Sequence, residues 1–96
     1  MRVIKSNGNY KLYYSGFHYI VECYDDTNDA REFYKLVNAC KEMYGEETTW
    51  ACPEGSKYGQ YIWNSNWRYD INKKLKRRRL YLKNETDITL LMLKAK

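Results

Sequence analysis

The chain has 96 residues, and its 17 Lys and Arg outnumber its 12 Asp and Glu, which gives a formal net charge of +5. This length suits one small domain, 1–96, and the 11 Tyr, 3 Trp and 2 Phe make its apolar material mostly aromatic, so buried rings will need partners for their O–H and N–H groups. No apolar run approaches the roughly 20 residues of a membrane span, and the amino end lacks the apolar core of a signal peptide, so we expect a cytoplasmic protein that does not enter a membrane.

Residues 1–24 are predicted to form a three-stranded antiparallel meander. Asn7-Gly8 and Ser15-Gly16 have the composition of two-residue hairpin turns, in which glycine accepts positive φ. Because side chains alternate along a strand, the register set by these turns fixes which residues share a face. The predicted core face carries Met1, Val3, Tyr10, Leu12, Tyr14, Phe17, Tyr19, Val21 and Cys23.

Residues 25–45, DDTNDAREFYKLVNACKEMYG, predict the main helix. Oxygen-bearing side chains at residues 25–28 can cap its first turn, and Gly45 is suited to the position just after its last turn. Phe33, Val37 and Cys40 recur at intervals of three and four residues, which gives the helix an apolar stripe. We expect this stripe to pack across the meander.

The pattern after Gly45 does not define a fold over residues 46–76, although TTWAC and YGQYIW are typical of short strands and NSN of a tight turn. Further on, RRLYLKN and DITLLMLK predict a hairpin that turns at residues 84–87. The predicted fold is therefore α+β, a single domain in which one main helix packs on an antiparallel sheet made of the meander and this carboxy-terminal hairpin.

The residues that could perform catalysis or bind a metal do not form a recognisable set. His18 is the only histidine, and no base or nucleophile pattern accompanies it. Cys23, Cys40 and Cys52 are separated by 17 and 12 residues, without the close pairs of structural zinc sites, so we expect free thiols. We also find no glycine-rich phosphate loop. The sequence predicts a protein that is not an enzyme and has no metal or cofactor.

The basic segment NKKLKRRRLYLKN stands out, because residues 73–80 contain six Lys and Arg. Residues 1–21 carry +3, residues 22–54 carry −6 and residues 57–96 carry +8, which sum to +5. Such polarity can present a basic surface to a polyanion or to an acidic protein, or it can simply be solvated.

The geometry of the basic segment depends on its secondary structure. If residues 76–83 form a strand, Arg77, Arg79, Tyr81 and Lys83 project from one face at intervals of about 6–7 Å, and this row could follow a phosphate backbone while Tyr81 stacks on a base. If residues 71–79 are helical, the basic side chains spread around the helix instead. Arginine suits either phosphate or carboxylate, because its planar group donates two parallel hydrogen bonds.

Aromatic residues gather between residues 50 and 69, where aliphatic residues are few. Trp, Tyr and Arg dominate protein interfaces and also stack on unpaired bases, although the same rings could fill a core. We expect Trp67, Arg68 and Tyr69 to be partly exposed. The candidate binding residues are Arg77, Arg78, Arg79 and Tyr81 as anchors, with Lys73, Lys74, Lys76, Trp67 and Arg68 around them.

In general build, the chain resembles small phage-encoded inhibitors of bacterial defence, especially anti-CRISPR proteins. The likeness lies in a short chain rich in Tyr, Asn and Lys, in a meander leading into a helix opened by DDTNDAREFYKL, and in the lack of a catalytic set. The resemblance implies stoichiometric binding to an effector nuclease or its guide-RNA complex in the cytoplasm of a bacterial host. Many of those inhibitors are acidic DNA mimics, so a net charge of +5 favours docking on acidic protein or exposed nucleic acid instead.

Two other functions fit the same residues. One is direct binding of DNA or RNA through the basic segment, and the other is assembly into a homo-oligomer through the aromatic residues. They differ in their dependence on salt and on protein concentration, because phosphate contacts weaken as salt rises.

Overall fold

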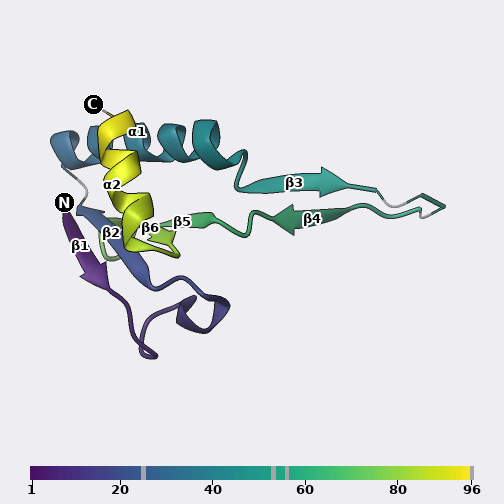
Figure 1. Ribbon diagram of the computed structural model, residues 1–96, viewed down its shortest axis with the longest axis horizontal. Coiled ribbons are helices and arrows are strands. Elements are labelled where there is room, and N and C mark those ends of the chain that lie inside the picture. Colours follow the sequence, from purple (N-terminus) through teal and green to yellow (C-terminus); the bar gives the residue numbers. More distant parts are fainter. Residues whose placement is uncertain (25, 53, 56, 96) are drawn as a thin grey trace.

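The computed structural model describes residues 1–24, 26–52, 54, 55 and 57–95, and it confirms a small α+β domain with the main helix packed on an antiparallel sheet (Figure 1). The sheet has four strands in the order β1-β2-β6-β5, and β3 and β4 form a separate two-stranded sheet. The elements are β1 (Arg2–Lys5), the 3₁₀ helix η1 (Tyr13–Ser15), β2 (Tyr19–Tyr24), α1 (Thr27–Tyr44), β3 (Thr48–Ala51), β4 (Gln60–Trp63), β5 (Trp67–Asn72), β6 (Arg77–Leu82) and α2 (Glu85–Lys94).

The register of the four-stranded sheet places one row of apolar side chains on one face and a row of charged side chains on the other. Val21 of β2 lies opposite Val3 of β1 and Leu80 of β6, and Leu80 lies opposite Tyr69 of β5. One residue further along, a row of charges crosses the sheet on its opposite face. This second row consists of Arg2, Glu22, Arg79 and Asp70.

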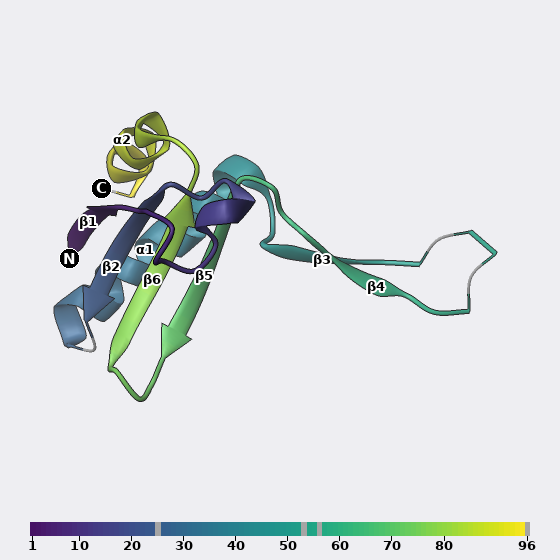
Figure 2. The same cartoon turned by 90° about the horizontal axis from the view of Figure 1, so that it is seen from below.

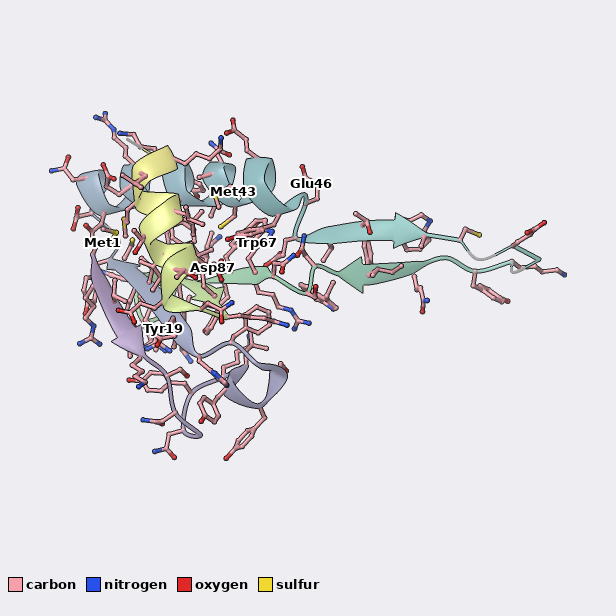
Figure 3. The ribbon with its side chains drawn as sticks, in the orientation of Figure 1. Met1, Tyr19, Met43, Glu46, Trp67 and Asp87 are labelled. Atoms are coloured by element: carbon pink, nitrogen blue, oxygen red, sulfur yellow. The ribbon has the colours of Figure 1, made fainter. Side chains whose placement is uncertain are left out.

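The helices α1 and α2 cover the apolar face, so the main core lies between them and the sheet (Figure 1). Trp67 is fully buried there, and its indole N–H donates to the backbone oxygen of Gly45 at 3.0 Å. Figure 3 shows Trp67 close to the end of α1. The buried residues of this core are Val21, Cys23, Phe33, Leu36, Val37, Ala39, Cys40, Trp67, Leu80, Leu82, Ile88 and Leu91.

A second, smaller cluster lies on the opposite face of the sheet. There Phe17, Ile20 and Tyr81 are buried, and residues 6–18 fold over them as a loop that contains η1. In Figure 2, α1 lies behind the sheet and this loop crosses the front of one end of it. The loop leaves the other end of this face without a covering helix.

The predicted amino-terminal meander is wrong, because β1 pairs directly with β2 and no strand forms between them. The turns at residues 7–8 and 15–16 are present, but the segment between them forms further turns and the 3₁₀ helix η1 instead of a strand. Leu12 adopts a left-handed conformation with φ of 68°, and η1 follows at once. The N–H of Ser6 donates to the oxygen of His18 at 2.8 Å, which continues the β1–β2 ladder and closes the loop. Phe17 therefore lies on the face opposite to Val3 and Val21.

The helix α1 confirms the prediction for residues 25–45. The side chain of Asp26 accepts a hydrogen bond from the N–H of Asp29 at 2.9 Å, which caps the first turn. At the other end Gly45 has φ of 89°, a conformation that favours glycine, and its N–H donates to the oxygen of Lys41. The helix therefore begins and ends where its sequence indicates.

The predicted carboxy-terminal hairpin is wrong in its second half. RRLYL forms β6, but residues 85–94 form α2 instead of a strand. The N–H of Asn84 donates to the carboxylate of Asp87 at 3.2 Å, and the hydroxyl of Tyr44 donates to the same side chain at 2.7 Å. Ile88 and Leu91 then recur at helical spacing against the core. The capping pair and this spacing favour a helix over a strand.

The strands predicted from TTWAC and YGQYIW are confirmed as β3 and β4. We call this hairpin, of which residues 48–52, 54, 55 and 57–63 are described, the arm, because it extends away from the rest of the molecule (Figures 1 and 2). The NSN turn is also confirmed, since Oδ1 of Asn64 accepts from the N–H of Asn66 at 2.8 Å. The turn leads into β5, whose residues the sequence pattern left undefined.

Asn64 joins the arm to the end of α1, and replacing it should destabilise the domain. Its amide donates to the oxygens of Tyr44 at 2.7 Å and Glu46 at 3.1 Å. We expect Asn64→Ala to lower the free energy of unfolding by about 2 kcal/mol, because it removes these bonds and the turn's side-chain acceptor. Urea unfolding measures the change. Asn38→Ala, at an exposed position of α1, should cost nothing, and an equal loss in both variants would contradict this role for Asn64.

Candidate functional site

The uncovered end of the sheet forms an open depression with a volume of about 630 Å³. We call it the basic depression, because five of the side chains that line it are cationic and one is acidic. The lining residues are Lys11, Asp70, Ile71, Asn72, Lys73, Lys74, Arg77, Arg79 and Tyr81. It lies on the face of the sheet opposite to α1 and α2.

The turn between β5 and β6 positions the basic residues at the edge of the depression. Oδ1 of Asn72 accepts a hydrogen bond from the N–H of Leu75 at 3.0 Å, and Lys76 adopts φ of 51° to complete the turn. After the turn β6 begins at Arg77, opposite Asn72. Because side chains alternate along a strand, Arg77 and Arg79 point to the same face. The strand alternative for the basic segment is thus confirmed, and the helical alternative is wrong.

Glu22 neutralises Arg79 and part of the charge of Arg2. The Nε atom of Arg79 lies 2.7 Å from one carboxylate oxygen of Glu22, and Arg2 lies 3.1 Å from the other. The side chain of Glu22 is only 2% exposed. Burial alone would raise the pKa of Glu22, but hydrogen bonds from Arg79 and Tyr24 and the two arginine charges outweigh it, so that this pKa is lowered. Arg79 is therefore held in place and contributes little free charge.

Asp70 offsets a second cation of the basic depression. Its carboxylate lies 3.4 Å from Nζ of Lys11, and it accepts a hydrogen bond from the hydroxyl of Tyr81 at 3.0 Å. Burial and the charge of Asp70 raise the pKa of Tyr81 to about 12, so this hydroxyl stays protonated at neutral pH. These contacts fix the floor of the depression.

Three cations of the basic depression remain uncompensated. Within the described part of the chain, no carboxylate lies within 4.0 Å of the charged groups of Lys73, Lys74 or Arg77. Lys73 and Lys74 are exposed in the turn, while Arg77 is half-buried at the start of β6. Three positive charges thus face solvent beside a rigid floor, which is an arrangement that attracts an anion.

The structure separates the other basic residues that the sequence singled out. Arg78 points to the helix-covered face, with its guanidinium 5.9 Å from the ring of Tyr34. Lys76 is exposed in the turn. Arg68 lies beyond the depression, between the rings of Trp63 at 4.5 Å and Phe17 at 5.7 Å. Of the arginines expected as anchors, Arg77 and Arg79 alone line the basic depression.

Two expectations about aromatic residues need correction. Trp67 was expected to be partly exposed, but it is 0% exposed because it fills the core beneath α1. Tyr81 was expected to offer a ring for stacking, but it is 1% exposed because the loop of residues 6–18 covers it. Neither ring can touch a partner in this structure.

Lys11, Asp70 and Glu22 complete the site, although the sequence analysis did not select them. They reach it from the loop of residues 6–18, from β5 and from β2. Nothing in their immediate sequence marks them, because strand pairing brings Glu22 and Asp70 to Arg79, and the ion pair with Asp70 brings Lys11 to the site from a loop far away in the chain.

The histidine and the buried cysteines do not line the basic depression. Among them no three His, Cys, Asp or Glu side chains lie close enough together to hold a metal ion. His18 packs against Tyr13, with 4.8 Å between ring centres. Burial raises the pKa of Cys23 to about 11 and that of Cys40 to about 12, so both are protonated thiols at neutral pH.

No protein-family model, curated protein or solved structure matches this chain. Among the described residues, neither helix has the length and apolar character needed to cross a bilayer. The function must therefore be inferred from the geometry and charge of the chain's own residues.

Proposed function

We propose that this chain is a non-enzymatic binding protein that docks on a nucleic-acid-handling complex of a bacterial host, such as a CRISPR effector, and blocks it stoichiometrically. The observation that supports this proposal most is the trio of uncompensated cations, Lys73, Lys74 and Arg77, beside an open depression of about 630 Å³. Such complexes carry both phosphate backbones and the carboxylates that hold catalytic metal ions, and either can meet these cations.

The rigid floor of the basic depression favours a specific contact over diffuse attraction. Arg79 and Tyr81 are locked by Glu22 and Asp70, so a partner that approaches Arg77 need not reorganise the residues beneath it. Binding costs less when the site is ordered in advance. The resemblance to phage-encoded inhibitors supports the same class of partner.

A positively charged inhibitor must act differently from a DNA mimic. A chain with a net charge of +5 cannot bind in a DNA channel by imitating phosphates, because such a channel is itself basic. Docking would instead cover an acidic surface of the effector or the nucleic acid that it exposes. Either contact blocks the complex with one copy of the chain, without turnover.

Affinity capture from a bacterial lysate tests this proposal, with and without nuclease treatment. We expect one nucleic-acid-handling complex to be retained in a fixed ratio to the bait. The double variant Arg77→Glu, Lys73→Glu should lose it, while Arg31→Glu, Lys57→Glu, which changes the net charge equally but lies outside the basic depression, should keep it. Capture of no specific complex, or equal capture by both variants, would overturn the proposal.

Direct binding of DNA or RNA is a second candidate, and the charge balance of the lining supports it, since five cations face one acid. Three uncompensated cations would contact about three phosphates, which for a single strand gives a slope of log K against log salt of about −2. Fluorescence anisotropy with random single strands measures this slope. Strong binding to naked strands, with nuclease-sensitive capture, would favour this function over docking on a protein.

A further inference from the structure

The arm is the neutral and aromatic part of an otherwise basic molecule. Residues 48–63 contain one acid, Glu54, and one base, Lys57, so all of the net charge of +5 resides elsewhere. Neither β3 nor β4 contains a charged residue. The arm extends along the longest dimension of the molecule, which is 46 Å, away from the sheet and both helices (Figure 1).

One face of the arm collects three large rings. The register pairs Thr48 with Trp63 and Trp50 with Tyr61, so these four side chains share a face, which we call the aromatic face. The rings of Trp50 and Tyr61 meet edge to face with 4.9 Å between their centres. The ring of Trp50 also lies close to Gly59, where a methyl group would overlap it. The aromatic face is therefore ordered by contacts within the arm.

The aromatic face remains largely open to solvent. Trp50 is 61% exposed, Tyr61 is 67% exposed and Trp63 is 52% exposed. An isolated two-stranded hairpin is only marginally stable in water, and contiguous exposed apolar surface marks an interaction site. Figure 3 shows the side chains of the arm projecting on both sides of its two strands, and at the base of the arm the guanidinium of Arg68 from β5 lies 4.5 Å from the ring centre of Trp63.

We propose that the aromatic face packs against the same face of a second copy of this chain, which makes the protein a two-fold symmetric dimer joined through its arms. A two-fold axis places identical patches against each other, and an uncharged patch meets its own copy without repulsion. Because each arm extends away from its basic domain, overlapping arms hold the two domains at opposite ends of the dimer.

The exposed area of the aromatic face limits the size of the dimer interface. A Trp or Tyr side chain can bury 150–250 Å², so the exposed parts of the three rings offer roughly 100 Å² each. With Thr48 and the neighbouring backbone, about 400–500 Å² per copy would be buried, or about 800–1,000 Å² in total, which lies at the low end for specific interfaces. Interfaces of this size are typical of weak complexes, so we expect a dissociation constant in the micromolar range.

Sedimentation equilibrium from about 1 to about 300 μM, a range that brackets a micromolar dissociation constant, tests the dimer with charge variants at its centre. Tyr61→Lys and Tyr61→Glu should each be monomeric, because like charges would oppose each other across the two-fold axis. A mixture of the two should recover a heterodimer, since opposite charges then meet. Tyr14→Lys, at an exposed aromatic of the loop outside the arm, is the matched control and should dimerise like the unmodified chain.

Recovery of the heterodimer also shows that both variants keep a folded arm, so loss of folding cannot imitate the expected result. An unmodified chain that stays monomeric at every concentration would overturn the proposal. A dimer that persists in Tyr61→Lys, or two variants that stay monomeric when mixed although their circular dichroism matches the unmodified chain, would overturn it as well. If the chain is a monomer and its Tyr61 variants lose affinity for single strands, the arm binds nucleic acid instead of a second copy.

Discussion

Replacing Glu22 by alanine is expected to lower the free energy of unfolding by about 3 kcal/mol at neutral pH, because it leaves the guanidinium of Arg79 without its partner. Arg79 is 11% exposed and lies 2.7 Å from Glu22, so solvent can replace only part of this contact. Urea unfolding followed by circular dichroism measures the change. The decrease in the free energy of unfolding should exceed that caused by Asn64→Ala, because the group left without a partner, the guanidinium of Arg79, is charged.

The controls separate the charge of Glu22 from its shape. Glu22→Gln keeps the shape and the acceptor oxygen, and we expect a loss of about 1–2 kcal/mol. Arg2→Met should cost about 0.5 kcal/mol, because Arg2 is 59% exposed and water screens its contact. A cost for Arg2→Met equal to that for Glu22→Ala would contradict the central role of the Arg79 contact.

The loss caused by Glu22→Gln should also depend on pH. The pKa of Glu22 in the folded protein is lowered from its ordinary value of 4.5, so the folded state binds fewer protons than the unfolded state as the pH falls through this range. The stabilisation by the carboxylate is therefore present above pH 4.5 and is lost as the pH falls through the folded pKa. The difference between the unmodified chain and Glu22→Gln should shrink there, and a constant difference would contradict this account.

Reversing two charges of the basic depression should weaken polyanion binding by at least about tenfold. Arg77→Glu, Lys73→Glu removes two of the three uncompensated cations and adds repulsion, and tenfold corresponds to about 1.4 kcal/mol. For a single-stranded probe, the slope of log K against log salt should become shallower, from about −2 to about −0.7, because one phosphate contact remains. Anisotropy with a labelled single strand at low salt measures both quantities.

A matched control distinguishes a local contact from overall attraction. Both double variants change the net charge by four, from +5 to +1, but Arg31 and Lys57 lie outside the basic depression. We expect Arg31→Glu, Lys57→Glu to retain most of the affinity and the original slope. Equal weakening by the two variants would mean that the whole charge of the chain attracts the probe, and the basic depression would lose its special role.

The local patterns of the sequence predicted the elements that depend on local contacts. The helix α1 follows from its cap, its apolar stripe and Gly45, and the turn at residues 64–66 follows from an asparagine side chain that bonds to the backbone two residues on. The class of fold follows from these elements. Each is stabilised by groups that are close together in the chain.

The incorrect elements depended on contacts that no local pattern reveals. Two glycine-containing turns indicated a strand between them. Leu12 instead adopts a left-handed backbone conformation, and Phe17 packs on Ile20 and Tyr81. The apolar run near the carboxy end was predicted to be a strand because the helix that it forms is short. The strongest helix signal there is the capping pair Asn84 and Asp87, which lies before the apolar residues. Tertiary packing decided both cases.

The residues of the candidate site could be predicted only in part, for the same reason. Alternation along a strand places Arg77 and Arg79 on one face, and the sequence indicated this arrangement. Only the strand order brings Glu22 beside Arg79 and Lys11 beside Asp70, and so determines which cations stay uncompensated. The site is a product of the sheet rather than of the basic segment alone.

We propose the basic depression as the surface that meets an anionic partner. Titrating a short single strand into the ¹⁵N-labelled protein and following its amide resonances tests this most directly. We predict that the shifted amides gather at Lys11, Asn72, Lys73, Lys74 and Arg77 and that the exposed side of α1 stays unchanged. Shifts that gather on α1 or on the arm would contradict it, and the absence of any shift would exclude direct binding of DNA or RNA, the second candidate function.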